Sequence, residues 1–153
     1  MKPKDWLYLN HIVRFGDTDA AGVIHFHHLM RWCHEAWEES LDTYGIKATD
    51  IFPSLIDNKS TVSTGLPIVH CEADFFSPIR IGDNLLIKLS PRKLDLRSFE
   101  IKYIFHNVQN ENVATALIRH FAINSKLAQS CSLPEEIDRW LEASSVNKIL
   151  RTS

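Results

Sequence analysis

One long amphipathic stripe constrains this fold more than any other feature of the sequence. Apolar and small residues recur at steps of three and four positions, at Phe26, Leu29, Trp32, Cys33, Ala36, Trp37, Ser40, Leu41 and Tyr44. This spacing predicts a long helix with one apolar face, and Gly45 stands where a left-handed residue commonly ends a helix. Because an apolar helix face has to be covered, we expect the helix to lie against a sheet.

Alternating patterns on both sides of the helix provide strands for that sheet. Before the helix, Trp6–Phe15 alternates as a half-buried strand does, with His11 on the apolar face. After a loop around Ile46–Ser60, four more strands are predicted, at Leu66–Phe76, Asp83–Leu94, Ser98–Val108 and Val113–Ile123. The polar connector 109–112 predicts an antiparallel hairpin for the last two. A short closing helix is predicted from Ser132, with Pro134 and Glu135 in its first turn.

The element order predicts an α+β fold with one mainly antiparallel sheet, in a single domain covering residues 1–153. A five-stranded sheet around one helix leaves open edges, and open edges favour pairing with another chain. We therefore expect a homodimer, and two dimers joined as a tetramer.

Composition excludes several classes of function. The formal net charge is −2 and no dense Lys/Arg run occurs, so nucleic acid is not an expected partner. No stretch approaches the ~20 apolar residues that span a bilayer, and the start of the chain does not resemble a signal peptide. The three cysteines, Cys33, Cys71 and Cys131, suggest neither a disulfide framework nor a metal site. We expect a cytoplasmic protein without a cofactor.

The most informative candidate site is the acidic turn Asp17-Thr18-Asp19-Ala20-Ala21-Gly22, between the first strand and the long helix. An Asp-x-Asp pair beside a glycine is most often an ordinary polar turn. Here a helix start follows it, near His25 or Phe26, and the first N–H groups of a helix have no partner within the helix. A carboxylate beside such donors can also suffice for acyl transfer from a thioester, whose thiolate leaves without much acid help.

Other candidates are weaker. His25, His27, His28 and His34 crowd the helix start, but their spacing is not that of a zinc site and His27 and His28 are expected on different helix faces. We expect surface or boundary positions for His27, His28 and His34. The chain has neither a Gly-x-Ser-x-Gly elbow nor a glycine-rich phosphate loop. Cys71 lies within a predicted strand and is expected to be a small core residue.

The segment Val13–Phe26 resembles the opening signature of the 4-hydroxybenzoyl-CoA thioesterase family, whose hotdog fold wraps a curved antiparallel sheet around one long helix. Leu29–Ala36, Pro78–Asp83 and Arg97-Ser98-Phe99 also resemble family segments, so the similarity extends over roughly Leu7 to Ser125. The resemblance implies an acyl-CoA thioesterase.

Residue roles follow from the same resemblance. Asp19 matches the catalytic carboxylate, acting as nucleophile or general base, and the backbone N–H of Phe26 matches the donor to the thioester oxygen, with His25 beside it. Asp17 is expected to shape the turn, and Gly22 to allow close backbone approach. Where some relatives carry several cations for the CoA phosphates, this chain has Arg97 and Ser98, with Arg92 and Lys93 nearby. For Arg92 and Lys93, solvated strand-end charges are an equal alternative.

The sequence constrains the acyl group of the substrate less than it constrains the reaction, thioester hydrolysis. Within the family the chain is most similar to members that hydrolyse a dihydroxynaphthoyl-CoA thioester for phylloquinone synthesis. Phe26, Trp32 or Phe76 could line an aromatic pocket, or could belong to the core. The alternatives are a thioesterase for short or medium aliphatic or 4-hydroxybenzoyl-type acyl groups, and a non-catalytic acyl-CoA binding module.

Overall fold

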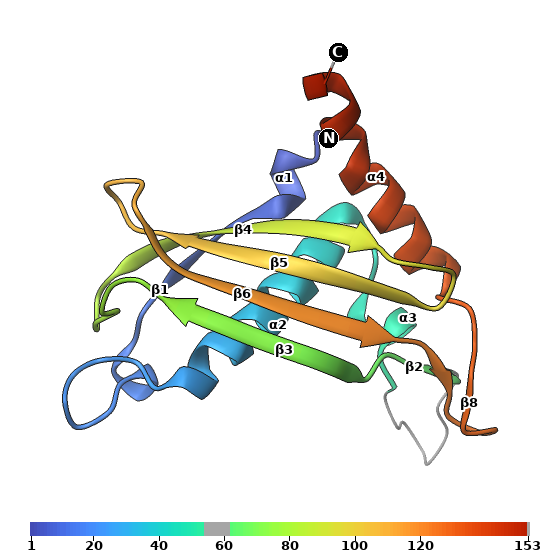
Figure 1. The fold of residues 1–153 in the computed structure, drawn as a ribbon, viewed down its shortest axis with the longest axis horizontal. Coiled ribbons are helices and arrows are strands. Elements are labelled where there is room, and N and C mark those ends of the chain that lie inside the picture. Colours follow the sequence, from blue (N-terminus) through green and yellow to red (C-terminus); the bar gives the residue numbers. More distant parts are fainter. Residues whose placement is uncertain (54–61, 153) are drawn as a thin grey trace.

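One curved antiparallel sheet forms the body of the molecule (Figure 1). The computed structural model describes residues 1–53 and 62–152, with side chains up to residue 145. The sheet has five strands in the order β1-β4-β5-β6-β3, and every neighbouring pair is antiparallel. The strands are β1 (Tyr8–Ile12), β3 (Ile68–Phe75), β4 (Asn84–Lys93), β5 (Ser98–His106) and β6 (Asn112–Phe121).

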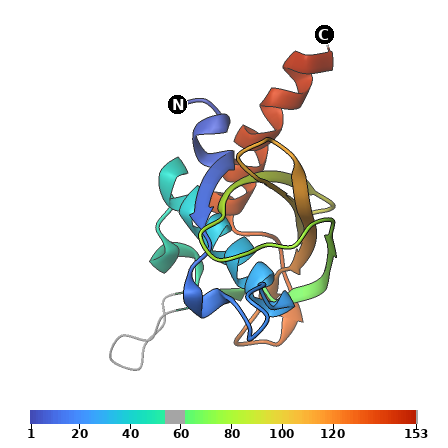
Figure 2. The same cartoon turned by 90° about the vertical axis from the view of Figure 1, so that its left-hand side faces the viewer.

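The expected long helix is α2, which spans Phe26–Tyr44 and lies along the face around which the sheet curves (Figures 1 and 2). Its buried residues follow the stripe in the sequence: Leu29, Trp32, Cys33, Ala36, Trp37, Ser40 and Leu41. Gly45 ends the helix with φ of 114°, and its N–H donates to the carbonyl oxygens of Leu41 and Asp42. The α+β architecture predicted from the periodicity, one helix against an antiparallel sheet, is confirmed.

The hairpin expected between the last two long strands is present. Residues of β5 and β6 pair in antiparallel register from Ser98 with Phe121 to His106 with Asn112. In the connection, Asn107 Oδ1 accepts the backbone N–H groups of Gln109 (3.0 Å) and Glu111 (2.9 Å). The side chain of Asn107 therefore satisfies two backbone N–H groups of the turn.

Several boundaries differ from the sequence-based expectations. A short helix α1 (Lys4–Leu7) occupies the start of the strand expected at Trp6–Phe15, and a 3₁₀ turn (Phe15–Asp17) occupies its end. The expected loop after α2 contains α3 (Ala48–Ile51), and the rest of it at 54–61 lies outside the described residues. A small sheet of β2 (Thr64–Gly65), β7 (Ile123–Asn124) and β8 (Gln129–Ser130) was not anticipated, because strands of two residues carry no periodic signal.

The closing helix is longer than expected. Helix α4 spans Glu135–Thr152, so it begins after Pro134 and is nearly as long as α2. Two buried indole hydrogen bonds attach it: Trp140 Nε1 donates to Ser40 Oγ of α2 (3.2 Å), and Trp6 Nε1 of α1 donates to Ser144 Oγ (3.0 Å). Among the helices in the described part of the chain, none combines the length and apolar character needed to cross a membrane.

Candidate active site

The acidic turn is a small closed loop attached to the rest of the protein. The N–H of Asp19 donates to the carbonyl oxygen of Val23 (2.9 Å), and the N–H of Gly22 donates to that of Asp19 (3.0 Å). Farther along, the N–H of Ile24 donates to the carbonyl oxygen of Ile79 (3.0 Å), in the connection between β3 and β4. These bonds fix the path of the backbone between the 3₁₀ turn and α2.

Gly22 serves this turn through its backbone conformation. Its φ of 79° lies in the left-handed region, where a side chain is strained. A Cβ built at this position would meet no atom within 4 Å. Within the protein itself, the requirement for glycine is therefore conformational, and the close backbone approach expected from the resemblance remains a prediction about a bound substrate.

Asp19 presents an exposed carboxylate at this turn. Its Oδ1 accepts the backbone N–H of Ala21 at 2.8 Å and, more weakly, that of Val23 at 3.4 Å. Over the residues that the structure describes, its Oδ2 makes no hydrogen bond or ion pair. One oxygen thus orients the carboxylate, and the other is available to a substrate or a water molecule.

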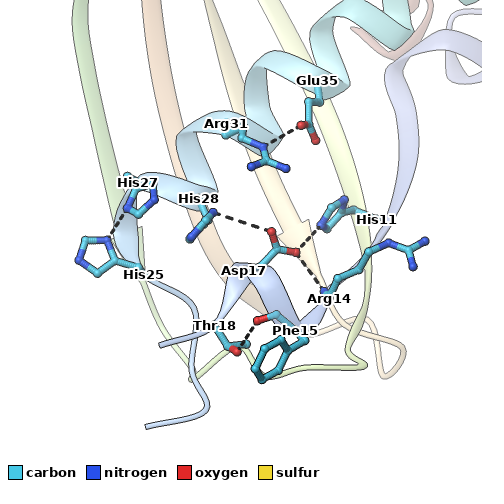
Figure 3. Close-up of polar contacts among 10 residues, drawn as sticks. All are labelled: His11, Arg14, Phe15, Asp17, Thr18, His25, His27, His28, Arg31 and Glu35. Atoms are coloured by element: carbon cyan, nitrogen blue, oxygen red, sulfur yellow. Dashed lines mark hydrogen bonds and ion pairs between the residues drawn. The ribbon is translucent and has the colours of Figure 1, made fainter. Parts of the chain in front are cut away.

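Asp17 has the opposite environment, although it lies only two residues away. It is 5% exposed, and its Oδ2 accepts the backbone N–H of Arg14 at 3.0 Å. Two histidines from different elements face the same carboxylate, with His11 Nε2 at 3.6 Å from Oδ2 and His28 Nδ1 at 3.8 Å from Oδ1 (Figure 3). Asp17 therefore lies among β1, the 3₁₀ turn and α2, as a residue with a structural role would.

The pKa of Asp17 reflects this environment. Burial raises the pKa of Asp17, but the Arg14 N–H, the Trp32 indole and His11 together lower it by a larger amount. The net shift of the pKa is therefore downward. The Trp32 indole is close enough to contribute, although its geometry falls short of a full hydrogen bond. Asp17 is thus held as a carboxylate, and its charge is largely hidden from solvent.

The start of α2 faces the turn with uncapped backbone donors. His25 is the N-cap residue, and its side chain makes no capping hydrogen bond. The first N–H groups of an α-helix have no partner one turn back, and the positive end of the helix dipole lies there. Here the N–H of His28 donates to the carbonyl oxygen of His25 at 3.0 Å, which leaves the donors before it for other acceptors. Phe26 begins the helix and its side chain is exposed. That its N–H donates to a substrate oxygen remains a prediction.

The histidines at the helix start form a contiguous row, which the sequence did not reveal. Nδ1 of His27 lies 2.6 Å from Nδ1 of His25, and the rings of His27 and His28 lie 4.0 Å apart between centroids. Although these two rings are in contact, the side chains meet different partners, as expected for different helix faces: His28 faces Asp17, and His27 faces His25 (Figure 3). Their expected surface or boundary positions, and that of His34, are confirmed: His27 is exposed, and His28 and His34 are partly buried.

The residues expected to bind CoA lie elsewhere. Arg92, Lys93, Arg97 and Ser98 surround the β4–β5 turn, at the opposite end of the sheet from the acidic turn (Figure 1). Arg92 pairs with Glu100 at 2.6 Å and Lys93 with Asp138 at 2.7 Å, so both already have carboxylate partners. Ser98 is buried.

Arg97 differs from its neighbours. Its guanidinium donates to the hydroxyl of Ser130 at 2.8 Å, and no carboxylate of the described residues lies within ion-pair distance of it. Arg97 is therefore the cation of this group that is most available to a phosphate.

The structure also separates the candidate aromatic residues. Trp32 is fully buried in the core, whereas Phe26 and Phe76 are exposed. Cys71 is exposed on β3, so the expectation that it is a core residue was wrong. An alternating apolar run does not distinguish a covered strand from an edge strand that has no covering layer in one chain.

Sequence reasoning missed the two partners of Asp17. His11 had been placed on the apolar face of its strand, and a histidine on such a face indicates a nearby polar group. His28 carried no comparable signal, because its proximity to Asp17 depends on how α2 meets the 3₁₀ turn. In the part of the chain that the structure describes, no group of three His, Cys, Asp or Glu residues is arranged to hold a metal ion.

Comparisons with known proteins identify the family of the chain. A family model described as "Thioesterase-like superfamily" matches residues 13–141. A "1,4-dihydroxy-2-naphthoyl-CoA hydrolase" of the cyanobacterium Prochlorococcus marinus is 59% identical over 95% of this chain and 93% of its own length.

Two solved structures are also similar. One from Prochlorococcus marinus strain MIT 9313 has a TM-score of 0.89 and 53% identity, covering 94% of this chain and 99% of its own. A 1,4-dihydroxy-2-naphthoyl-CoA thioesterase from Synechocystis has a TM-score of 0.79 and 27% identity, covering 88% of this chain and 94% of its own. With the curved sheet, the long helix and the family model in agreement, this chain belongs to the thioesterase-like superfamily and has the hotdog fold.

Proposed function

We propose that this protein is an acyl-CoA thioesterase that hydrolyses 1,4-dihydroxy-2-naphthoyl-CoA to 1,4-dihydroxy-2-naphthoate and CoA, a step of phylloquinone synthesis. The observation that carries the proposal is the exposed Asp19 carboxylate, oriented by the Ala21 N–H just before the uncapped start of α2. The similarity to relatives named for this reaction supports the choice of substrate.

Asp19 and Phe26 divide the chemistry between them. The Phe26 N–H donates to the thioester oxygen and stabilises the negative charge that develops on it. Acting as general base, Asp19 takes a proton from water while the water oxygen attacks the carbonyl carbon. Acting as nucleophile, Asp19 attacks the carbon itself, and water then cleaves the resulting anhydride. In both cases the C–S bond breaks, and the thiolate leaves as CoA.

His25 completes this group as a polar side chain adjacent to Phe26. An imidazole N–H there would donate to the oxyanion or to the departing sulfur. Its role therefore depends on which of its ring nitrogens carries the proton.

The working enzyme is proposed to be a homo-oligomer that shares its sites between copies. In one chain, the β4–β5 turn and the acidic turn lie at opposite ends of the sheet, so one protomer does not bring the proposed phosphate contacts to its own acidic turn (Figure 1). Antiparallel pairing of β3 with a two-fold related copy would bring the partner's end of the sheet toward that turn. Two such dimers would form the tetramer.

A substrate panel tests the proposal. CoA release would be measured from 1,4-dihydroxy-2-naphthoyl-CoA, benzoyl-CoA and butyryl-CoA, with the wild-type protein and with Asp19→Asn. We expect the naphthoyl thioester to have the highest kcat/KM, and Asp19→Asn to lower kcat at least about a hundredfold because it removes the base or nucleophile.

The matched control is Asp42→Asn, which changes an exposed acid of α2 away from the site and should leave turnover unchanged. Near wild-type turnover by Asp19→Asn would remove Asp19 from the mechanism. Preference for butyryl-CoA would overturn the aromatic assignment while retaining the thioesterase. Stoichiometric binding without turnover would indicate a binding module.

A further inference from the structure

His25 and His27 make the shortest side-chain contact at the start of α2. Their Nδ1 atoms lie 2.6 Å apart, although both side chains are exposed. From this pair we propose that His27 is a positioning residue, which donates its Nδ1 proton to His25 and thereby fixes the proton of His25 on Nε2. The hydrogen bond between the two rings does not depend on the proposed function. Only the use of the His25 Nε2 proton during thioester hydrolysis rests on it.

The proton count of the contact supports a defined arrangement. A neutral imidazole carries one proton, so a hydrogen bond between two Nδ1 atoms requires a proton on one of them and a lone pair on the other. When Nδ1 of His25 is the acceptor, the proton of His25 has to be on Nε2. The opposite arrangement would leave Nε2 of His25 bare, with a lone pair that repels a developing oxyanion or thiolate.

His27 is supported from the side opposite His25. Its ring contacts that of His28 at 4.0 Å between centroids, and His28 Nδ1 lies 3.8 Å from the Asp17 carboxylate. Asp17 is in turn held by the N–H of Arg14. The row therefore runs from a buried, fixed carboxylate through two helix side chains to the residue before Phe26 (Figure 3).

The charges around His25 and His27 favour a single proton between their two Nδ1 atoms over a proton on each of these atoms. Partial loss of hydration, followed by His28, His25 and Arg31, lowers the pKa of His27 below its ordinary value. Asp17 of the 3₁₀ turn and His11 of β1 are the other titratable groups close to this row. When both rings become protonated in acid, neither Nδ1 can accept, and the hydrogen bond is lost.

Two substitutions of His27 separate hydrogen bonding from packing. His27→Phe keeps an aromatic ring for His28 to contact but has no donor. His27→Asn places an amide N–H close to the position of the lost Nδ1 and does not titrate. We expect His27→Phe to lower kcat about tenfold with little change in KM, and His27→Asn to restore most of kcat.

A double-mutant cycle then shows whether His27 acts through His25. In a His25→Gln background, His27→Phe should have no further effect, because the residue it positions is absent. His106→Asn, on β5 outside the row, is the control and should match the wild type. An equal loss of activity from His27→Phe with and without His25 would overturn the proposal, and so would an unchanged kcat in His27→Phe.

Nitrogen-15 NMR of the imidazoles provides a readout that needs no turnover. We expect His25 as the Nε2–H tautomer in the wild type and in His27→Asn, and as a mixture of tautomers in His27→Phe. An Nδ1–H tautomer of His25 in the wild type would overturn the proposal. If the wild type hydrolysed no thioester, the proposed function would fail, while the NMR result would still decide whether His27 sets the proton of His25.

Discussion

At the scale of single residues, two acids two positions apart lie in different environments. Asp19 is exposed and has one uncommitted oxygen, whereas Asp17 is buried among Arg14, His11 and His28. The division of roles suggested by the resemblance, with Asp17 as scaffold and Asp19 as the reacting group, remains a prediction that these environments support. It leads to distinct expectations for stability.

Asp17→Asn should destabilise the protein without removing the reacting carboxylate. The folded-state pKa of Asp17 is lowered, so its contribution to stability is present above about pH 4, the usual range of a free carboxyl, and is lost as the pH falls further. At pH 7 we expect the substitution to lower the free energy of unfolding by about 2 kcal/mol. Urea unfolding at pH 7 and pH 3 would measure this, and the deficit should shrink at pH 3.

The control for this experiment is Asp19→Asn, which alters an exposed carboxylate in the same turn. Its unfolding free energy should stay close to that of the wild type. Equal destabilisation by both substitutions would show that the charge of Asp17 has no special structural role.

His120 predicts a second pH dependence. Burial, opposed by the hydrogen bond to the Leu66 carbonyl and assisted by nearby His34, lowers the pKa of His120 to about 4. The unfolded chain therefore binds a proton near pH 6.5 that the folded protein does not bind, and stability falls as the pH drops from 7 toward 4. From this group we expect a loss of about 2 kcal/mol between pH 7 and pH 5.

His120→Phe tests this assignment. The phenyl ring can keep the stacking on Phe99, which lies 5.1 Å from the imidazole between centroids, but it cannot take up a proton. The variant should lose less stability than the wild type between pH 7 and pH 5. Parallel pH curves for the two proteins would contradict the assignment.

At the scale of elements, the fold depends on how α4 and α1 attach to the central helix and sheet. The buried Trp140–Ser40 and Trp6–Ser144 hydrogen bonds join segments far apart in the sequence. A buried N–H without an acceptor lowers the stability of the fold. The hydroxyls of Ser40 and Ser144 therefore favour the helix positions in which both indole N–H groups are paired.

Ser40→Ala should therefore loosen α4. The substitution leaves the N–H of Trp140 buried without its acceptor, and we expect a loss of about 1–3 kcal/mol in unfolding free energy. Thermal unfolding would measure the loss, with Ser145→Ala, an exposed position of α4, as the control. Comparable melting temperatures for Ser40→Ala and the wild type would show that packing alone holds the helix.

At the scale of the whole molecule, strand β3 is an edge of the sheet that exposes apolar side chains to solvent. Val69 is 56% exposed, Phe75 43%, and Phe76, just beyond the strand, 60%. An edge with apolar side chains and unpaired backbone groups is a surface for pairing with another chain. It supports the proposed homodimer and a site shared between copies.

Val69→Asp tests that arrangement. A charge on β3 should oppose pairing and convert the oligomer to a monomer, and CoA release should fall at least about tenfold if sites are shared. Analytical ultracentrifugation would give the mass. Val108→Asp changes another exposed valine, at the β5–β6 hairpin, and should alter neither property. A monomeric wild type, or a fully active monomeric variant, would exclude the shared site.

The main elements could be predicted from the sequence, because each repeats a local pattern over many residues. The stripe from Phe26 to Tyr44 and the glycine after it predicted both ends of α2 as they are observed. The alternating runs located the five long strands, and the Asp-x-Asp turn identified the candidate site. Short or non-periodic elements, such as α1, α3 and β2, could not be seen in this way.

Features that depend on contacts between distant segments became visible in the folded chain alone. The tertiary structure placed His11 and His28 beside Asp17, joined His25 to His27, left Cys71 on an exposed edge, and separated Arg97 from the acidic turn by the length of the sheet. Periodicity reports which face of one element is apolar, whereas the partner of a charge or ring depends on how several elements meet. The acidic turn could therefore be found from sequence, but the different surroundings of its two acids could not.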